Sequence, residues 1–96
     1  MLLSFVIPVL NEVDSIRLLT AQIQKNCGSH DYEIIFIDDG SRDGSFEVME
    51  ELAHHNSKIK IIKFRRNFGK AAALQHGFKL ASGDVVFTLD ADLQDN

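Results

Sequence analysis

The sequence predicts an α/β fold in which strands and helices alternate in the order β-α-β-α-β-α-β and the strands form one parallel sheet. Four short apolar runs, rich in β-branched residues and with little polar alternation, are typical of strands covered on both faces. Between them lie three segments in which apolar residues recur at spacings of three and four, the helical period. Strands joined through helices are normally parallel with right-handed crossovers, so the alternation indicates a parallel sheet.

The first strand is expected over residues 3–9, a continuous apolar run. The first helix follows it and places Val13, Ile16, Leu19 and Ile23 on one face. Asn11 is a candidate for its N-cap, and Gly28 is expected to end it.

The second strand is expected over residues 33–37. The second helix begins near Ser45 and ends at residues 54–56, where two histidines form an exposed end. Three apolar residues share one face of this helix: Phe46, Met49 and Ala53.

The third and fourth strands are expected over residues 59–64 and 85–89, with the third helix between them. The apolar face of that helix consists of Ala71, Leu74, Phe78 and Ala81. The helix closes at Ser82 and Gly83, where glycine supplies a left-handed cap. Gly77 lies inside the helix and costs about 1 kcal/mol relative to alanine.

Length and composition are those of one soluble globular domain. A chain of this length, 96 residues, buries about two-thirds of its unfolded surface, which allows a modest core. The hydrophobic fraction of 45% and the charged fraction of 25% argue against a disordered tail, a fibre or a membrane bundle.

Charge and cysteine content exclude further classes. The net charge of -4 disfavours a nucleic-acid binder that relies on general attraction to phosphates. The single cysteine, Cys27, excludes an internal disulfide and a cysteine-based zinc site. The apolar start of the chain contains Pro8 and lacks a basic leader, and no run is long enough to span a membrane. We therefore expect a cytoplasmic chain with no nucleic-acid partner.

Polar residues gather where the predicted strands end. They belong to residues 8–12, 38–41, 65–67 and 90–92. In parallel sheets, ligands bind at the carboxyl ends of the strands. The sequence therefore predicts a rim of carboxylates and basic side chains, contributed by segments that are far apart in the chain.

Asp90 and Asp92 are two residues apart, so their side chains share a direction if the strand stays extended. Gln94 continues the series with a neutral oxygen. Carboxylates together with substrate phosphate oxygens suit Mg²⁺ or Mn²⁺. Such a cation stabilises the charge that develops on a departing diphosphate.

Basic residues add positive charge to the same rim. Lys70 falls in the first turn of the third helix, whose N-terminus favours anions, and Arg65 and Arg66 precede it. Simpler interpretations stay open for each feature taken alone. An Asp-x-Asp pair is a weak metal signal, the segment 38–41 is typical of a turn, and the arginines and Lys70 are equally consistent with solvated charges.

Four segments resemble the successive motifs of family 2 glycosyltransferases. They are residues 4–12 (SFVIPVLNE), 37–41 (IDDGS), 66–70 (RNFGK) and 89–95 (LDADLQD). Within this family the chain most resembles the polyprenyl-phosphate sugar transferases, the group of dolichyl-phosphate mannose synthase and bactoprenol glucosyltransferase. The resemblance covers nearly the whole chain, and four motifs in order are far more specific than any one.

The resemblance implies a GT-A fold whose Rossmann-like half binds a nucleotide-diphosphate sugar. It places Pro8, Glu12 and Asp39 in the nucleoside pocket, with Leu10 and Ile37 as neighbouring wall or backbone contacts. Leu10 departs from the family pattern, because many relatives carry a tyrosine there that stacks on the base.

The resemblance also implies roles for the Asp-x-Asp-x-Gln series. Asp92 and Gln94 are expected to bind the metal, while Asp90 and Ala91 lie nearer the ribose and the diphosphate. Asp90 and Asp92 are the expected catalytic residues, and Lys70 is expected to contact the donor.

The activity implied by the resemblance is the inverting transfer of a hexose from a UDP- or GDP-sugar to an acceptor, namely a polyprenyl phosphate at the cytoplasmic face of the membrane. A phosphate acceptor is already ionised at neutral pH, so a strong general base is unnecessary. A complete GT-A domain is longer than this chain. We therefore expect residues 1–96 to be the nucleotide-sugar-binding half, without the acceptor half and with little or no transferase activity alone.

Two other classes stay open from the residues themselves. A phosphotransferase of the haloacid dehalogenase type also carries Asp-x-Asp after a parallel strand and uses the first aspartate, here Asp90, as the nucleophile. A non-catalytic module that binds metal or nucleotide would use the acidic rim as a switch. An unpaired sheet edge leaves a homo-oligomer open as well.

Overall fold

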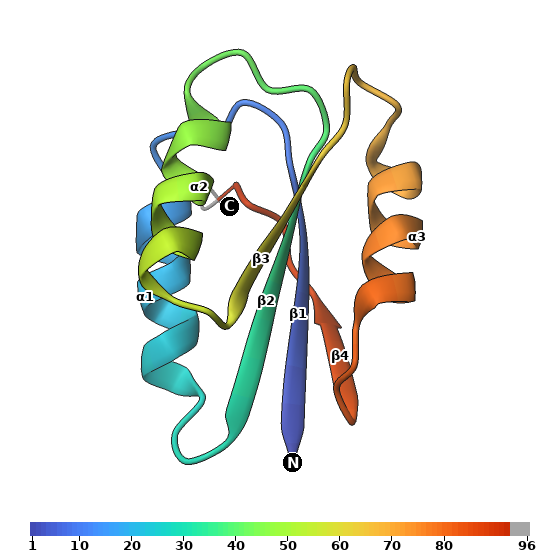
Figure 1. Ribbon diagram of the computed structural model, residues 1–96. Helices are drawn as coiled ribbons and strands as arrows, with labels where there is room; N and C mark the ends of the chain where they lie inside the picture. Colours follow the sequence, from blue (N-terminus) through green and yellow to red (C-terminus); the bar gives the residue numbers. More distant parts are fainter. Residues whose placement is uncertain (93–96) are drawn as a thin grey trace.

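The computed structural model describes residues 1–92, and within them four parallel strands form one sheet in the order β3-β2-β1-β4 (Figure 1). The strands are β1 (Leu2–Val9), β2 (Asp31–Asp38), β3 (Ile59–Lys63) and β4 (Val85–Thr88). The central strand β1 pairs with both β2 and β4, so that Val6 lies opposite Ile35 on one side and Thr88 on the other. The predicted strands and their parallel pairing are confirmed.

Three helices connect the strands and cover the sheet from both sides. Helices α1 (Ile16–Asn26) and α2 (Ser45–His55) lie on one side, and α3 (Lys70–Leu80) lies on the other (Figure 1). The layers are therefore helix, sheet and helix, as the sequence predicts.

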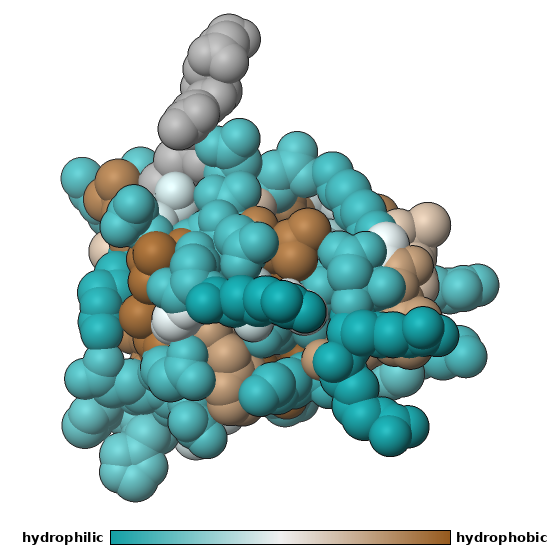
Figure 2. Space-filling view, turned by 90° about the horizontal axis from the view of Figure 1, so that it is seen from above, coloured by the Kyte–Doolittle hydropathy of each residue, from teal (hydrophilic) through white to brown (hydrophobic). Residues whose placement is uncertain are grey.

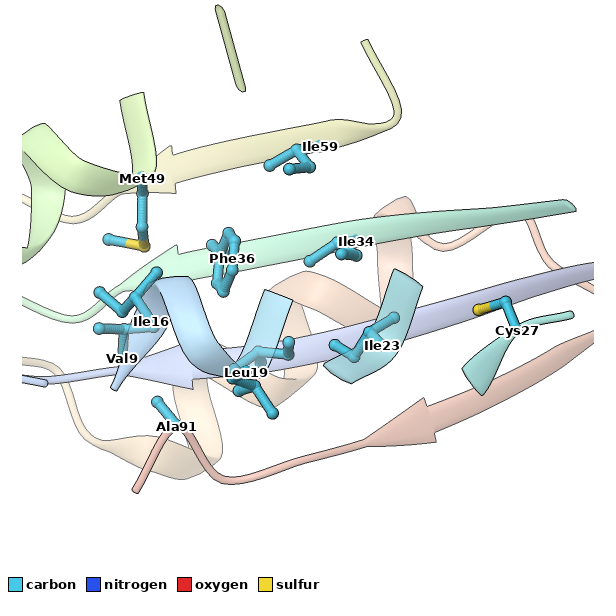
Figure 3. Close-up of a cluster of buried hydrophobic side chains, with 11 residues drawn as sticks. Val9, Ile16, Leu19, Ile23, Cys27, Ile34, Phe36, Met49, Ile59 and Ala91 are labelled. Carbon is cyan, nitrogen blue, oxygen red and sulfur yellow. The ribbon is translucent and has the colours of Figure 1, made fainter. Parts of the chain in front are cut away.

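The larger core lies between the sheet and helices α1 and α2. Phe36 and Ile34 of β2 point into it and are fully buried (Figure 3). The predicted apolar face of α1 packs there through Ile16, Leu19 and Ile23, and Met49 of α2 is also fully buried there. The helical spacing read from the sequence correctly identifies the buried faces of these two helices, except that Val13 lies before the start of α1.

The predicted N-cap at Asn11 is wrong. Helix α1 begins at Ile16, after Ser15, and its start carries no side-chain cap. Asn11 instead has a left-handed backbone with φ of 55°, and its side-chain oxygen accepts the backbone N–H of Arg42 at 2.8 Å. Asn11 therefore joins two loops, a long-range contact that local capping patterns do not contain.

The predicted apolar face of α3 is only partly correct. Leu74 and Ala81 pack against the sheet, but Ala71 is exposed and Phe78 is 50% exposed. The fully buried residue Ala73 and the buried Gly77 form the contact surface instead. A Cβ at Gly77 would lie 2.3 Å from Cγ1 of Val6, so the absence of a side chain is what allows α3 to approach the sheet.

The left-handed cap expected at Gly83 is absent, because α3 ends at Leu80 and the following residue, Ala81, is already extended. Gly83 serves a different contact. Its N–H donates to the hydroxyl of Ser4 at 2.8 Å, and a Cβ at Gly83 would lie 2.4 Å from the same oxygen. Close packing against β1, and not backbone handedness, requires glycine here.

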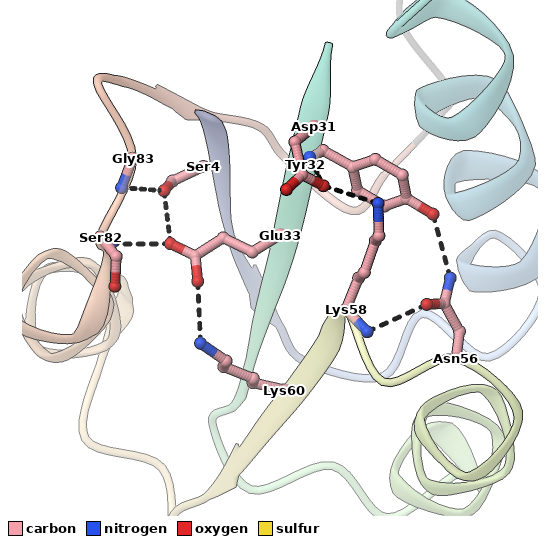
Figure 4. Close-up of polar contacts among 9 residues, drawn as sticks. All are labelled: Ser4, Asp31, Tyr32, Glu33, Asn56, Lys58, Lys60, Ser82 and Gly83. Atoms are coloured by element: carbon pink, nitrogen blue, oxygen red, sulfur yellow. Dashed lines mark hydrogen bonds and ion pairs between the residues drawn. The ribbon is translucent and has the colours of Figure 1, made fainter. Parts of the chain in front are cut away.

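A buried polar network fixes the turn between α3 and β4 (Figure 4). Glu33 of β2 is 5% exposed and accepts hydrogen bonds from the Ser4 hydroxyl at 2.5 Å and the Ser82 N–H at 2.7 Å. Lys60 of β3 donates to its other oxygen at 2.9 Å. One carboxylate thus ties β1, β2, β3 and the turn before β4 together at the amino end of the sheet.

Strand β4 departs from the expectation that every strand is covered on both faces. Val85, Val86 and Phe87 are 37%, 41% and 42% exposed. Helix α3 packs mainly over β1 and β2, so among residues 1–92 neither helical layer covers β4 fully. Phe87 stacks on Phe5 of β1, with ring centroids 5.2 Å apart.

Candidate functional site

A hollow of about 540 Å³ opens at the carboxyl ends of the strands. Figure 2 looks down on this end of the molecule, where hydrophilic side chains surround a few hydrophobic ones. The hollow is lined by Pro8, Val9, Leu10, Glu12, Asp39, Asn67, Gly69, Lys70, Asp90, Ala91 and Asp92. The rim predicted from the strand ends therefore exists, and it brings together segments from β1, β2, β4 and the start of α3.

Glu12 lies in the loop between β1 and α1, at the edge of the hollow. Partial burial raises the pKa of its carboxyl group above the usual value, and the nearby charges of Asp92 and Asp43 raise it further. Glu12 and Asp92 both line the hollow, so the ends of β1 and β4 bring two carboxylates to one site.

Hydrogen bonds join the β1–α1 loop to the β2–α2 loop. The N–H of Asn11 donates to the Ser41 hydroxyl at 2.9 Å, and the N–H of Glu12 donates to the Ser45 hydroxyl at 2.9 Å. The N–H of Val13 donates to Asp43 at 3.1 Å. These bonds satisfy backbone donors that a loop without regular structure would otherwise leave to water.

Asp39 faces the hollow and also fixes its far wall. The side chain is 3% exposed, and Oδ1 accepts the N–H of Phe68 at 2.7 Å while Oδ2 accepts the N–H of Gly69 at 3.1 Å. The loops approach closely here, since a Cβ at Gly40 would lie 2.8 Å from the backbone nitrogen of Asn67. Asp39 thereby sets the entry to α3 and, with it, the position of Lys70.

Lys70 forms an ion pair with Asp90 across the hollow. Both side chains are more than half exposed, so the pair is open to solvent and to a ligand. An exposed pair of this kind contributes little to stability. The first aspartate of the Asp-x-Asp pair is thus compensated by a lysine from the neighbouring helix.

Asp92 also lines the hollow and is exposed, whereas Ala91 between the two aspartates is buried. The predicted metal ligand Gln94 lies outside the described residues. Within residues 1–92, no group of three or more histidine, cysteine or acidic side chains is placed to hold a metal ion. The assignment of Asp92 and Gln94 to a metal therefore stays a prediction.

The donor chemistry of the described residues fits a hard divalent cation. The carboxylates of Asp92 and Glu12 line the same hollow, and Mg²⁺ or Mn²⁺ is commonly held by one or two carboxylates with water and substrate phosphates completing the shell. A cation held by Asp92 alone would need that help from the substrate.

Some candidates from the sequence do not line the hollow. Ile37 is fully buried with Val6 and Ala73 on the α3 side of the sheet, where it supports the end of β2. Arg65 and Arg66 are exposed beside the hollow, and the Arg66 guanidinium lies over the Phe68 ring, 4.7 Å from its centroid.

Asp38, which belongs to the predicted rim segment 38–41, and Asp43, which lies just beyond it, have other positions. Asp38 is fully buried, and its Oδ1 accepts the N–H of Ser41 at 2.9 Å. Asp43 binds the backbone of the β1–α1 loop. Sequence reasoning places Ser45 at the start of the second helix but misses its contact with the β1–α1 loop, although an aspartate two residues before a serine at a helix start is a recognisable turn pattern.

Residues 4–96 match the family model described as glycosyl transferase family 2. The chain belongs to this family. The match covers all four motifs, and it favours the transferase interpretation over the phosphotransferase and the non-catalytic module.

Several related proteins match nearly the whole chain in sequence. Undecaprenyl-phosphate 4-deoxy-4-formamido-L-arabinose transferases of Pseudomonas fluorescens and Aeromonas hydrophila are 48% and 47% identical to it, over 95% and 97% of its length. The putative glycosyltransferase CsbB of Bacillus subtilis is 42% identical over 97% of the chain. The matches cover 28% to 29% of these relatives, so the chain spans less than a third of their length.

Solved structures share the fold. The mannosyltransferase PcManGT from Pyrobaculum calidifontis, in complex with GDP-Man and Mn²⁺, superposes with a TM-score of 0.83 at 24% identity, covering 94% of this chain and 27% of its own. Residues 1–349 of S. aureus TarS superpose with a TM-score of 0.81 at 23% identity, covering 96% of this chain and 28% of theirs. The predicted GT-A relationship of the fold is confirmed. In residues 1–92, no helix has the length and apolar character needed to cross a bilayer.

Proposed function

We propose that the hollow at the strand ends binds the nucleotide-diphosphate part of a UDP- or GDP-sugar. The single observation that carries this proposal is the convergence of Glu12, Asp39 and Lys70 with residues 90–92 on one hollow. Carboxylates accept hydrogen bonds from the N–H groups of a base, and a lysine offers a point charge to phosphate oxygens. The site therefore offers chemistry for both ends of such a ligand.

We assign the nucleoside end to Pro8, Leu10, Glu12 and Asp39, and the diphosphate end to Lys70 and residues 90–92. Asp39 still has lone pairs for a base, because a carboxylate offers about four acceptor positions. Leu10 is 43% exposed and supplies an apolar wall to the base. The neighbour PcManGT, solved with GDP-Man, supports a donor of this class.

A divalent cation, Mg²⁺ or Mn²⁺, belongs to this proposal, with Asp92 and Gln94 as its ligands. When bound, it stabilises negative charge on the departing diphosphate. The Mn²⁺ complex of PcManGT supports the use of such a cation in this fold. Lys70 acts at the same oxygens. Because it is paired with Asp90, we expect it to exchange that carboxylate for the diphosphate.

For the whole enzyme we propose transfer of a hexose to a polyprenyl phosphate, with inversion at the sugar carbon. The names of the undecaprenyl-phosphate transferases support a lipid-phosphate acceptor. The acceptor oxygen attacks on the side opposite the leaving diphosphate, and it is already ionised at neutral pH. We place the whole enzyme at the cytoplasmic membrane face.

Calorimetric titration tests the binding proposal. The chain is titrated with UDP, GDP and their sugars, with and without Mn²⁺, beside Asp92→Ala and the control Asp14→Ala, which removes an exposed carboxylate of the β1–α1 loop. We expect Mn²⁺-dependent binding of one nucleotide, weakened at least about tenfold by Asp92→Ala, since even residues that only support metal ligands have effects of that size. Equal affinity in Asp92→Ala and the control would remove the metal assignment. Absence of binding to every nucleotide would contradict the proposal as a whole.

A further inference from the structure

We propose that Asp43 is a positioning residue for Glu12, and that it holds the nucleoside end of the hollow in its binding geometry. The inference rests on the proposed function, in which Glu12 binds the nucleoside part of the ligand. Asp43 itself does not line the hollow. Its effect passes through the backbone of the β1–α1 loop.

The contacts of Asp43 reach Glu12 by two routes. Oδ2 accepts the N–H of Val13, the residue after Glu12, at 3.1 Å. Oδ1 accepts the Ser45 hydroxyl at 2.6 Å and the Ser45 N–H at 3.0 Å. The Ser45 oxygen in turn accepts the N–H of Glu12 at 2.9 Å. The backbone donors on both sides of the Glu12 carbonyl are therefore held by Asp43, one directly and one through a hydroxyl.

Ser45 is a rigid relay because of where it lies. It is the first residue of α2 and is fully buried. A hydroxyl has one proton and two lone pairs, so the proton that goes to Asp43 leaves the oxygen free to accept from Glu12. A buried hydroxyl with both functions satisfied has one favourable orientation, which fixes the distance between the two loops.

Charge makes this arrangement stronger. Partial burial alone would raise the pKa of Asp43, but hydrogen bonds from the Ser45 side chain and from the Val13 and Ser45 backbone outweigh it and the pKa is lowered. Asp43 is therefore an ionised acceptor, and hydrogen bonds to an ionised acceptor are shorter and stronger than neutral ones. The position of Asp43 just before α2 also places its charge near a helix N-terminus, which is favourable.

Glu12 needs such support because a loop without regular secondary structure carries it. The β1–α1 loop has no helix to hold it until Ile16. Without its backbone anchors, Glu12 is free to turn toward water and away from the hollow.

The first part of the test measures the anchors without any ligand. Amide hydrogen exchange is compared in the unsubstituted chain, Asp43→Ala, Ser45→Ala and the control Asp14→Ala. We expect the amides of Glu12 and Val13 to exchange at least about tenfold faster in Asp43→Ala, since a lost charge-assisted bond opens the loop by that factor or more. Asp14→Ala leaves both unchanged. Unchanged exchange in Asp43→Ala would overturn the inference.

The second part is a double-mutant cycle on nucleotide affinity with Glu12→Gln. Asp43→Ala alone is expected to weaken nucleoside diphosphate binding about fivefold to tenfold, and Asp43→Asn less, because the amide oxygen keeps one acceptor. In the Glu12→Gln background the effect of Asp43→Ala should fall to less than about twofold, since the group that it positions is no longer there. If Asp43 acted only on the stability of the fold, Asp43→Ala would weaken binding by the same factor in the Glu12→Gln background.

The outcomes separate the inference from the proposed function. Additive effects of Asp43→Ala and Glu12→Gln, with normal binding by the unsubstituted chain, would overturn the role of Asp43 alone. Failure of the unsubstituted chain to bind any nucleoside diphosphate would contradict the proposed function, and the exchange rates would still decide whether Asp43 holds the loop. A coupled loss of affinity together with faster exchange at Glu12 and Val13 supports the inference.

Discussion

At the scale of single residues, Glu12 is held where its ionised form is unfavourable. Its pKa is raised by burial and by two neighbouring carboxylates, so the folded state binds a proton at Glu12 more tightly than the unfolded state does. Ionisation of Glu12 at neutral pH therefore lowers stability. An arrangement of this kind is typical of a group that is placed for a ligand or a cation and not for the fold.

We predict that Glu12→Gln raises the melting temperature at pH 7, by less than about 4 °C. The gain should shrink as the pH falls toward and below the usual pKa of a glutamate, because the wild-type carboxyl is then protonated in both states. Thermal melts between pH 4 and 8 check this, with Glu47→Gln, an exposed glutamate of α2, as the control. A lower melting temperature for Glu12→Gln at pH 7 would contradict the unfavourable placement.

Lys70 supplies a second prediction at this scale. Lys70→Ala should weaken binding of a nucleoside diphosphate about tenfold and leave binding of the nucleoside unchanged, since the lysine meets only the phosphates. The comparison is made by calorimetry, with Lys79→Ala on the same helix as the matched control. A similar loss for nucleoside and diphosphate would show that Lys70 acts on the fold of the loop and not on phosphate.

The residues at the rim could be predicted from sequence to the extent that they follow strand ends. Glu12, Asp39 and Asp92 come together as expected, because parallel strands end at one edge. That Arg65 and Arg66 do not line the hollow could not be predicted. Their position depends on the path of the loop between β3 and α3, which Asp39 holds through the N–H groups of residues 68 and 69.

At the scale of elements, the packing of α3 depends on a residue without a side chain. A Cβ at Gly77 would lie 2.3 Å from Cγ1 of Val6 and 2.8 Å from Cδ1 of Ile37. These atoms belong to buried side chains of two strands, so the helix or the sheet would have to move.

We predict that Gly77→Ala lowers the free energy of unfolding by about 1 to 3 kcal/mol, the usual cost of overpacking a core. Helix propensity alone predicts the opposite sign, a gain of about 1 kcal/mol. The exposed control Ala71→Gly isolates the propensity term. Denaturant unfolding of both variants decides between overpacking and helix propensity. A Gly77→Ala protein more stable than the unsubstituted chain would contradict the close approach of α3 to the sheet.

The hydrogen bonds to Glu33 are the second feature at the scale of elements. Burial alone would raise the pKa of Glu33, but hydrogen bonds from Ser4, Lys60 and the Ser82 backbone outweigh it, and the pKa is lowered. The stability that Glu33 contributes is therefore present above its unfolded pKa and is lost as the pH falls through the folded pKa.

We predict that Glu33→Ala costs about 2 to 3 kcal/mol at pH 7, because it leaves the Ser4 hydroxyl and the Ser82 N–H without their acceptor. The cost should decrease in acid, which denaturant unfolding at pH 7 and near pH 3 measures. Glu51→Ala, which removes the partner of Arg17 in an exposed ion pair, serves as the control and should have little effect. A cost for Glu33→Ala that does not change with pH would mean that the packing of the Glu33 side chain, and not the hydrogen bonds to its charged carboxylate, holds the turn before β4.

The sequence predicts the existence and order of the elements well, because their periodic apolar patterns are local. Helices α1 and α2 bury the faces that their spacing indicates. Helix α3 does not, since its contact surface of Ala73 and Gly77 is made of small residues that hydrophobicity does not distinguish from exposed ones. Asn11 shows the same limit, because its partner Arg42 is distant in the sequence.

At the scale of the whole molecule, the two ends of the sheet have different tasks. The amino end carries the Glu33 network, which fixes the start of β4. The carboxyl end carries the hollow, to which β4 brings residues 90–92. Because β1 pairs with β4 over Leu3 to Val6, the register set at one end determines where the Asp-x-Asp pair lies at the other.

The central claim is that segments distant in sequence form one binding site for a nucleoside diphosphate. The most direct measurement is a map of backbone amide chemical shifts during titration with UDP and with GDP in the presence of Mg²⁺. The account predicts that one of the two nucleotides shifts the amides of residues 9–12, 39–41, 67–70 and 90–92 together, with a single dissociation constant. The protein has a second, mostly apolar hollow, lined by Phe5, Cys27 and Phe87 among others. Shifts confined to that hollow, or no shifts with either nucleotide, would contradict the account.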